Sequence, residues 1–386
     1  MALEPFTISI SDAAIDDLHR RLAEPRWPGD FSNADWRYGV PEPDLVELVE
    51  YWRDGYDWRV HEASMNRYPQ FKTSIEGVPV HFLHVRGKGP NPKPLILTHG
   101  WPWTFWDFRD VIEPLTDPAR FGARPEDAFD IVIPSLPGFG FSSPLETPGI
   151  NFSRTADLWD RLMRETLGYS RYAAHGGDWG ALVTAALGHK FADHLHGVHE
   201  SLPGFLGLDY TALRKEDYAA DEAGWYEHTK SMEARTASHM AVHSLDPQTL
   251  AYALNDSPVG LAAWILERRR AWSDCGGDVE RCFSKDDLLT TISLYWYTGT
   301  IGTSLRFYWE NAHNPWTPSH DRQPTVPAPS AFAVFPRDVL LVPRRVAERH
   351  ANVRRWTVMP EGGHFAAAEQ PQRLVEDIRA FFGHDV

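Results

Sequence analysis

The sequence predicts an α/β protein: a mostly parallel sheet flanked by helices, with an N-terminal arm and an inserted helical cap. Short apolar segments at 95–98, 130–134 and 170–174 alternate with helical segments, and this alternation is typical of parallel sheets. The alternation stops after residue 205, a helical stretch follows, and strands resume after residue 320. The interruption indicates a cap inserted between two parts of one sheet.

Size and charge exclude several classes of protein. The 386 residues, 42% of them hydrophobic, can bury a large core, which argues against disorder. A net charge of −15 argues against nucleic acid or an anionic membrane as a partner. No apolar run is long enough to span a membrane, and the first five residues are too polar for a signal peptide, so we expect a cytoplasmic protein. For Cys275 and Cys282 a local disulfide stays open, but reduced thiols are favoured, and no metal-binding spacing is present.

Residues 1–75 predict an arm that packs on the core and the cap. Residues 6–10 alternate like a strand, and Ser11 then caps a helix that stops at Pro25. Residues 30–70 are rich in tryptophan and tyrosine, with apolar spacing for one further helix. The sequence of this segment is too irregular to form a sheet of its own.

Residues 76–205 predict the first part of the core. A hairpin joins the strands 71–75 and 78–85. The strands 95–98 and 130–134 are continuously apolar, as suits a sheet that is covered on both faces. A helix at 153–167 precedes the strand at 170–174 and the helix at 181–191.

Residues 206–320 predict the helical cap, and residues 321–386 predict the end of the core. Pro258 begins the clearest cap helix, in which the arginine run 268–270 is most simply a solvated face. After a proline-rich link, strands resume and an amphipathic helix closes the chain.

The central chemical signal is Gly-Gly-Asp-Trp-Gly at residues 176–180, between a predicted strand and a predicted helix. Small residues around one reactive side chain are typical of the nucleophile elbow of α/β-hydrolases. The central residue is Asp178, where an esterase has serine. A carboxylate nucleophile attacks saturated carbon and forms an alkyl ester that water must then split. The alternative is a glycine-rich turn with a capping aspartate.

The loop after the strand at 95–98 reads His-Gly-Trp-Pro. In α/β-hydrolases this loop supplies one amide of the oxyanion hole, and the residue after the nucleophile supplies the other. The N–H groups of Trp101 and Trp179 are therefore the candidates. The alternative is an ordinary loop before proline.

A base must activate the water, and His364 follows the last strand and a Gly-Gly loop. Asp338 follows the preceding strand and is the candidate acid that orients this base. The order Asp178, Asp338, His364 matches the nucleophile, acid and base order of the fold. Glu361 is a rival for the acid but is too close to the base in sequence, and a solvent-facing turn aspartate is the alternative for Asp338.

These motifs resemble those of epoxide hydrolases of the microsomal-type group, within the α/β-hydrolase superfamily, in a bacterial-type form without the membrane anchor. The resemblance covers nearly the whole chain and is carried by Arg-Trp-Pro at 26–28, the motifs at 99–102 and 176–180, Leu-Asn-Asp-Ser-Pro at 254–258 and Gly-Gly-His-Phe-Ala-Ala at 362–367. It implies the α/β-hydrolase fold with a helical cap and an N-terminal arm.

The resemblance also implies two acids in the cap that hold and protonate the epoxide oxygen, usually a pair of tyrosines. One matches Tyr308. The other falls on His239, which departs from the pair; a neutral histidine can donate one hydrogen bond, and a protonated one could act as an acid. We expect Trp103 and Trp309 to line the substrate pocket.

The expected reaction converts a small-molecule substrate, an apolar or aromatic epoxide, and water to a vicinal diol, with no cofactor or metal. A homodimer is compatible with the sequence. Two alternatives stay open: a dehalogenase of haloalkanes or haloacids on the same fold, and a ligand-binding homologue that has lost turnover. The first would need halide-binding donors, and the complete set of Asp178, Asp338 and His364 argues against the second.

Overall fold

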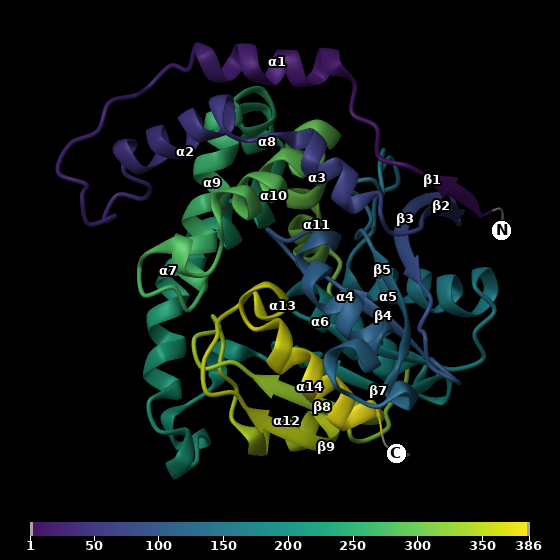
Figure 1. Ribbon diagram of the computed structural model, residues 1–386. Helices are drawn as coiled ribbons and strands as arrows, with labels where there is room; N and C mark the ends of the chain where they lie inside the picture. The colour runs from purple at the N-terminus through teal and green to yellow at the C-terminus, as the bar shows by residue number, and fades with distance from the viewer. Residues whose placement is uncertain (1–2, 384–386) are drawn as a thin grey trace.

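A computed structural model describes residues 3–383 (Figure 1). Within these residues one sheet has the strand order β1-β2-β3-β5-β4-β6-β7-β8-β9. The β1-β2, β2-β3 and β3-β5 pairs are antiparallel, and every later pair is parallel, which confirms the predicted α/β class with a mostly parallel sheet. The strands are β1 (Glu4–Phe6), β2 (Gln70–Ile75), β3 (Val78–Val85), β4 (Lys93–Thr98), β5 (Phe129–Pro134), β6 (Tyr172–Gly176), β7 (Leu195–Glu200), β8 (Val326–Val334) and β9 (Ala351–Val358).

Helices cover both faces of the central strands. Every residue of β5 and β6 is buried, which requires cover on both sides of the sheet. The helices α5 (Phe152–Arg161) and α6 (Trp179–Lys190) pack together on one side, and α4 (Arg109–Thr116) packs with α14 (Pro371–Phe382). The core therefore lies along β4, β5 and β6, directly beneath the loops at their carboxyl ends.

The cap lies between β7 and β8 and is built from five helices. The residues from 206 to 224 form only short turns, so the predicted helical stretch begins later than expected, after Gly224 at a φ of 89°. Ser257 caps one helix by accepting the N–H of Gly260, and Ser284 caps another in a reciprocal pair with Asp287. The helices are α7 (Trp225–Leu245), α8 (Pro247–Asp256), α9 (Pro258–Trp272), α10 (Lys285–Thr298) and α11 (Ile301–His313).

The arginine run in α9 is not a solvated face, so this prediction was wrong. Arg268 and Arg269 are 4% and 2% exposed. The Arg268 guanidinium lies 3.6 Å from the Trp264 ring centroid, and Arg269 Nη1 lies 2.7 Å from Asp107 Oδ1. Because α9 packs against the arm, α8 and α10, it has little free surface, and these charges are instead compensated by an aromatic ring and a carboxylate.

The arm leaves the sheet after β1, crosses the cap and returns to the sheet at β2 (Figure 1). The helices α1 (Asp12–Ala23) and α2 (Glu42–Asp54) pack on α9, and α2 and α3 (Trp58–Met65) pack on α10. The strand predicted at residues 6–10 lies earlier in the chain, at Glu4–Phe6, and shares only Phe6 with the prediction. The N–H groups of Ile8 and Ile10 donate to the side chains of Asn66 and Glu62 instead of to a neighbouring strand.

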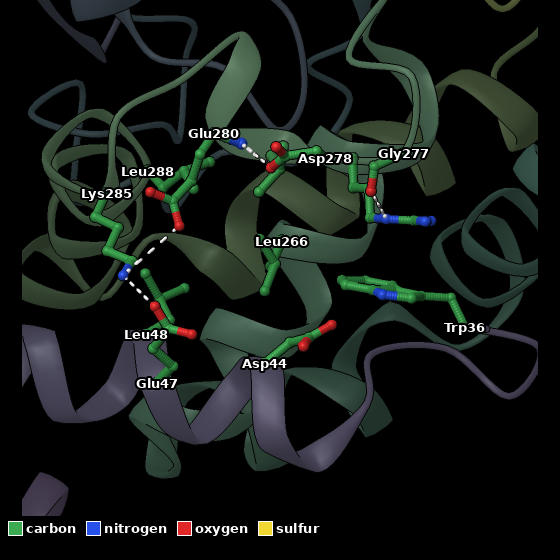
Figure 2. Close-up of a pocket in the computed structure, with 12 residues that line it drawn as sticks. Trp36, Asp44, Glu47, Leu48, Leu266, Gly277, Asp278, Glu280, Lys285 and Leu288 are labelled. Carbon is green, nitrogen blue, oxygen red and sulfur yellow. Dashed lines mark hydrogen bonds and ion pairs between the residues drawn. The ribbon is translucent and has the colours of Figure 1, made fainter. Parts of the chain in front are cut away.

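A cavity of about 230 Å³ lies at the junction of α2 with α9 and α10 (Figure 2). Lys285 bridges it: its ammonium pairs with Glu47 of α2 and lies 3.6 Å from the carboxylate of Glu280. On the other side, the Arg270 guanidinium lies 4.1 Å from the centroid of the Trp36 ring. Charged and aromatic contacts thus join the arm to the cap.

Two further observations concern the chain as a whole. No helix among residues 3–383 combines the length and the apolar character needed to cross a membrane. Cys275 and Cys282 are free thiols, which confirms the reading favoured from the sequence.

Candidate active site

Asp178 lies on a strained turn between β6 and α6. Its φ of 51° and ψ of −126° are unusual for a residue with a side chain. The turn fits only because its neighbours are glycines: a Cβ on Gly180 would lie 1.9 Å from the carbonyl oxygen of Thr98, and one on Gly176 would lie 2.1 Å from the carbonyl oxygen of Gly180. The predicted elbow is therefore present, and the carboxylate of Asp178 lines a cavity.

The two carboxylate oxygens of Asp178 have different partners. Oδ1 accepts the backbone N–H of Trp101 at 2.8 Å, and Oδ2 lies 3.2 Å from Nε2 of His364. Trp101 follows β4 and Asp178 follows β6, and these parallel neighbours end at the same edge of the sheet. The second amide predicted for the oxyanion hole, the N–H of Trp179, belongs to the first residue of α6, directly after Asp178 in the chain.

His364 lies between two carboxylates. Its Nδ1 is 2.7 Å from Oδ1 of Asp338, which follows β8, and Asp338 and His364 are both 2% exposed. Burial lowers the pKa of His364, but the negative charges of Asp338 and Asp178 outweigh burial and raise the pKa to about 10. The rival carboxylate of Glu361 instead pairs with Arg373 at the surface.

The cap supplies Tyr308 from α11 and His239 from α7, and both line the same cavity as Asp178 and His364. Their rings are perpendicular, with centroids 5.6 Å apart. His239 also stacks on the ring of Trp101 at 5.6 Å. Burial, reinforced by the charge of Asp178, raises the pKa of Tyr308 well above its ordinary range. Burial lowers the pKa of His239 well below its ordinary range, so the ring is neutral and the protonated form considered from the sequence is disfavoured.

The cavity measures about 370 Å³ and lies between the sheet edge and the cap. One face of α7 forms a wall, because residues at helical spacing point to the same side. The loops after β7 and β8 form the opposite wall, and Trp272 at the end of α9 contributes a third side. The lining side chains outside the predicted site are mostly apolar or small: Leu182, Leu202, Pro203, Gly204, Tyr210, Thr211, Thr229, Glu233, Thr236, Met240, Trp272, Val339 and Leu340.

Two residues predicted to line the pocket do not. Trp309 is 37% exposed and stacks on His313, because each helix residue turns by about 100° from the last and Tyr308 already faces the cavity. Trp103 is buried behind the base, with its ring centroid 5.6 Å from that of His364. Its carbonyl accepts the hydroxyl of Tyr295, so it supports the site from the core side.

The sequence reasoning missed three residues at the site. Trp272 lines the cavity, and its ring centroid lies 4.7 Å from that of His239 and 5.3 Å from that of His364. His243 lies one turn after His239 and packs on Tyr308 at 4.8 Å; the spacing of four between the histidines is the signal that could have found it. Glu369 accepts backbone N–H groups on both sides of His364. Among residues 3–383 no group of potential ligands is arranged to hold a metal ion.

Comparison with known proteins identifies the family. The family described as epoxide hydrolase N terminus matches residues 3–108, and the one described as alpha/beta hydrolase fold matches residues 93–258. A protein named putative epoxide hydrolase from Stigmatella aurantiaca is 41% identical over 381 residues, which is 98% of this chain and 84% of that protein. The chain belongs to the epoxide hydrolase family. The protein is therefore an enzyme, a hydrolase that acts on ether bonds, in agreement with the resemblance found in the sequence.

Further relatives and solved structures agree. Epoxide hydrolase 1 from Sus scrofa is 37% identical to this epoxide hydrolase, over 99% of this chain and 89% of that protein. The structure of Aspergillus niger epoxide hydrolase superposes with a TM-score of 0.86 at 30% identity, covering 99% of this chain and 96% of that one. Juvenile hormone epoxide hydrolase from Bombyx mori gives a TM-score of 0.89 at 28% identity, with 99% and 94% covered. These matches confirm the α/β-hydrolase fold.

Proposed function

We propose that Asp178, His364 and Asp338 are the catalytic triad with which this enzyme converts an apolar or aromatic epoxide to a vicinal diol. The proposal rests on the different partners of the two carboxylate oxygens of Asp178. One oxygen is held by the N–H of Trp101 at 2.8 Å, and the other lies 3.2 Å from the base. A carboxylate held in this way can act first as a nucleophile and then as an ester carbonyl.

In the first step Oδ2 of Asp178 attacks an epoxide carbon, because Oδ1 is already occupied by the N–H of Trp101. A carbon–oxygen bond forms while the ring bond to the same carbon breaks. The phenol of Tyr308 keeps its proton at neutral pH because its pKa is high, and it transfers that proton to the more basic alkoxide as the ring opens. The neutral ring of His239 has one N–H with which it can hold the same oxygen.

In the second step His364 takes a proton from water. Formation of the ester removes the charge of Asp178, one of the two charges that raise the pKa of His364, so this pKa falls. The ring then gives up the proton that it holds in the resting enzyme, which restores the phenol of Tyr308, and its free nitrogen can accept a proton from water. The resulting hydroxide attacks Cγ of Asp178, and the N–H groups of Trp101 and Trp179 stabilise the negative charge on Oδ1. Collapse of this intermediate breaks the ester, and the leaving oxygen takes the remaining proton of the attacking water, so the diol is released and Asp178 is again a carboxylate. The proton taken from water stays on His364 and restores the resting enzyme.

The lining of the cavity supports an apolar substrate. The hydroxyl of Thr229 accepts the N–H of Leu341 at 3.0 Å, and the hydroxyl of Thr236 donates to the carbonyl of Met232 at 3.1 Å. Both hydroxyls are thus occupied by backbone groups, which leaves little polar wall for a substrate to contact. A volume of about 370 Å³ lies toward the small end of ligand-binding cavities, so the substrate is of modest size.

Single-turnover hydrolysis of styrene oxide in heavy-oxygen water, with enzyme in excess, tests the mechanism. We expect the first diol to carry ordinary oxygen from Asp178 and the heavy oxygen to appear in the peptide that contains Asp178, both measured by mass spectrometry. The isosteric variant Asp178→Asn is the control and should form no diol. A diol that carries heavy oxygen in the first turnover would mean that water attacks directly and that Asp178 is not the nucleophile.

The sequence also predicts a cytoplasmic location and admits a homodimer. Both stay predictions, and gel filtration with light scattering would decide the second.

A further inference from the structure

Every backbone N–H of the loop that carries His364, residues 362–365, donates a hydrogen bond within the protein. We call it the base loop. Its partners come from the end of α9 and the residues just after it, residues 272–274, and from Glu369 at the end of α13 (Ala366–Glu369). Gly362 donates to Oδ2 of Asp274 at 2.9 Å, Gly363 to Oε2 of Glu369 at 3.0 Å, His364 to the carbonyl of Trp272 at 2.9 Å, and Phe365 to Oε1 of Glu369 at 2.8 Å.

Glu369 is the shared partner in this arrangement. Its two oxygens hold the residues on either side of His364, and Oε2 also accepts the N–H of Asp274 at 2.8 Å. Three backbone N–H donors favour an ionised carboxylate. Loss of hydration works in the other direction and raises the pKa of Glu369 to about 7. One carboxylate therefore joins the base loop to the cap segment that supplies Trp272.

This position bears on the chemistry of His364. The ring must keep Nδ1 on Asp338 at 2.7 Å while Nε2 faces the carboxylate that becomes the ester. The backbone of a base sets where its ring can lie, and a small displacement of a catalytic group costs a large factor in rate. Two flanking N–H groups held by one rigid side chain fix both ends of the residue that carries the ring.

We propose that Glu369 is a positioning residue that holds His364 in place for hydrolysis of the ester. The proposal rests on the role proposed above for His364 as the base. Glu369 does not line the substrate cavity, and its hydrogen bonds go to the base loop and to the N–H of Asp274. Its removal should slow the step that uses His364 as a base and spare the step in which Asp178 attacks the epoxide.

The variant Glu369→Gln tests this. Glutamine has the same shape but only one acceptor oxygen, so in any orientation its NH₂ group faces at least one of the three N–H donors. With styrene oxide we expect hydrolysis of the ester to slow by roughly 10- to 100-fold while alkylation changes by less than about twofold. The alkylated enzyme should then accumulate in rapid-quench mass spectrometry. In the steady state kcat and KM should fall together and leave kcat/KM unchanged.

Two further variants make the result interpretable. Glu361→Gln changes a carboxylate beside the base loop that pairs with Arg373 at the surface, and it should behave like the unmodified enzyme. Asp274→Ala removes the hydrogen-bond acceptor of Gly362. Because Asp274 is half-exposed, this variant should fold even if Glu369→Gln does not. It should accumulate less ester than Glu369→Gln. A purely structural role for Glu369 predicts a different pattern, with lower kcat, unchanged KM and no accumulated ester. That pattern would overturn the proposal.

The variant His364→Gln separates failure of this proposal from failure of the proposed function. If His364→Gln traps an ester on Asp178 and neither Glu369→Gln nor Asp274→Ala does, only the role of Glu369 is wrong. If His364→Gln traps no ester, the covalent mechanism itself is wrong and the role of Glu369 falls with it.

Discussion

At the scale of single residues, the charge on Asp178 controls the state of His364. With both carboxylates ionised, the pKa of His364 is raised to about 10, so the ring holds a proton in the resting enzyme at neutral pH. A protonated ring cannot accept another proton from water. Ester formation neutralises Asp178 and so prepares the base at the moment when it is needed, which keeps the two steps in order.

The variant Asp178→Asn tests this coupling, because the amide is neutral like the ester and nearly the same shape. We expect the pKa of His364 to fall by a unit or more, which corresponds to about 1.4 kcal/mol per unit. Nuclear magnetic resonance titration of the His364 ring measures it, with His364→Gln in the same background to assign the signal. An unchanged pKa would show that Asp338 alone sets the proton affinity of the ring.

The same coupling predicts how stability depends on pH. A histidine whose pKa is raised on folding stabilises the fold fully below its ordinary pKa of 6.5, and this contribution is lost as the pH rises through about 10. Between those values the unmodified enzyme should therefore lose more free energy of unfolding than Asp178→Asn does. Urea unfolding of both proteins at the two ends of this pH range would give the difference.

The roles of individual residues could be predicted where the residue directly follows a strand. Asp178, Asp338 and His364 each come after an apolar segment, and parallel strands bring their carboxyl ends to one edge. Tyr308 and Trp309 could not be separated in this way, because only the packing of α11 decides which of two neighbouring aromatics faces the cavity. The hydrogen bond that the N–H of Asp274 donates to Glu369 joins residues 95 positions apart, and no local sequence pattern indicates it.

At the scale of secondary-structure elements, α9 is bonded to the loop after β4, whose Trp101 N–H binds the carboxylate of Asp178. Arg269 Nη1 pairs with Asp107 at 2.7 Å, and Nη2 donates to the carbonyl of Pro102 at 2.9 Å, one residue from the amide that binds Asp178. Asp107 in turn accepts the N–H of Thr104. Arg269 and Asp107 therefore link a cap helix to the loop after β4 that carries the N–H of Trp101.

Breaking this pair should be costly because it leaves a buried charge without a partner. We expect Arg269→Met to lower the free energy of unfolding by about 3–5 kcal/mol. The double variant Arg269→Met with Asp107→Asn removes the stranded charge but keeps an acceptor for Thr104, so it should be more stable than the single variant. Urea unfolding measures both, with Arg270→Met, whose guanidinium lies at the more open junction with Trp36, as the control. A double variant no more stable than the single one would contradict this account.

The element pattern was largely predictable, and its main error is instructive. Hydrophobic periodicity located most of the buried strands and helices, since it reflects burial directly, but it missed the buried strand β7. It failed for α9, where three consecutive arginines indicate solvent and yet two of them are buried. Their burial depends on Trp264 within the same helix and on Asp107 of another part of the chain, and the second partner cannot be read from the helix itself.

At the scale of the whole molecule, the arm holds the cap onto the core. Trp52 of α2 is fully buried and donates its indole N–H to the hydroxyl of Ser293 in α10 at 3.1 Å. The hydroxyl of Tyr56 lies 3.1 Å from that of Thr290 on the same helix. The arm then continues through α3 into β2, which lies between β1 and β3 in the sheet, so contacts with α10 are tied to the core by a short length of chain (Figure 1).

This arrangement predicts that loosening the arm loosens the cap first. Trp52→Phe leaves a void and removes one hydrogen bond of the buried hydroxyl of Ser293, so we expect a loss of about 1–3 kcal/mol. If the arm restrains the cap, hydrogen exchange in α10 should speed up more than exchange in β4, β5 and β6, because local opening needs less free energy than global unfolding. Tyr38→Phe, at an exposed site in the same arm, should leave both unchanged. Equal acceleration in α10 and the central strands would instead mean that Trp52 contributes only to global stability, and that the cap is held closed by its own contacts with the core.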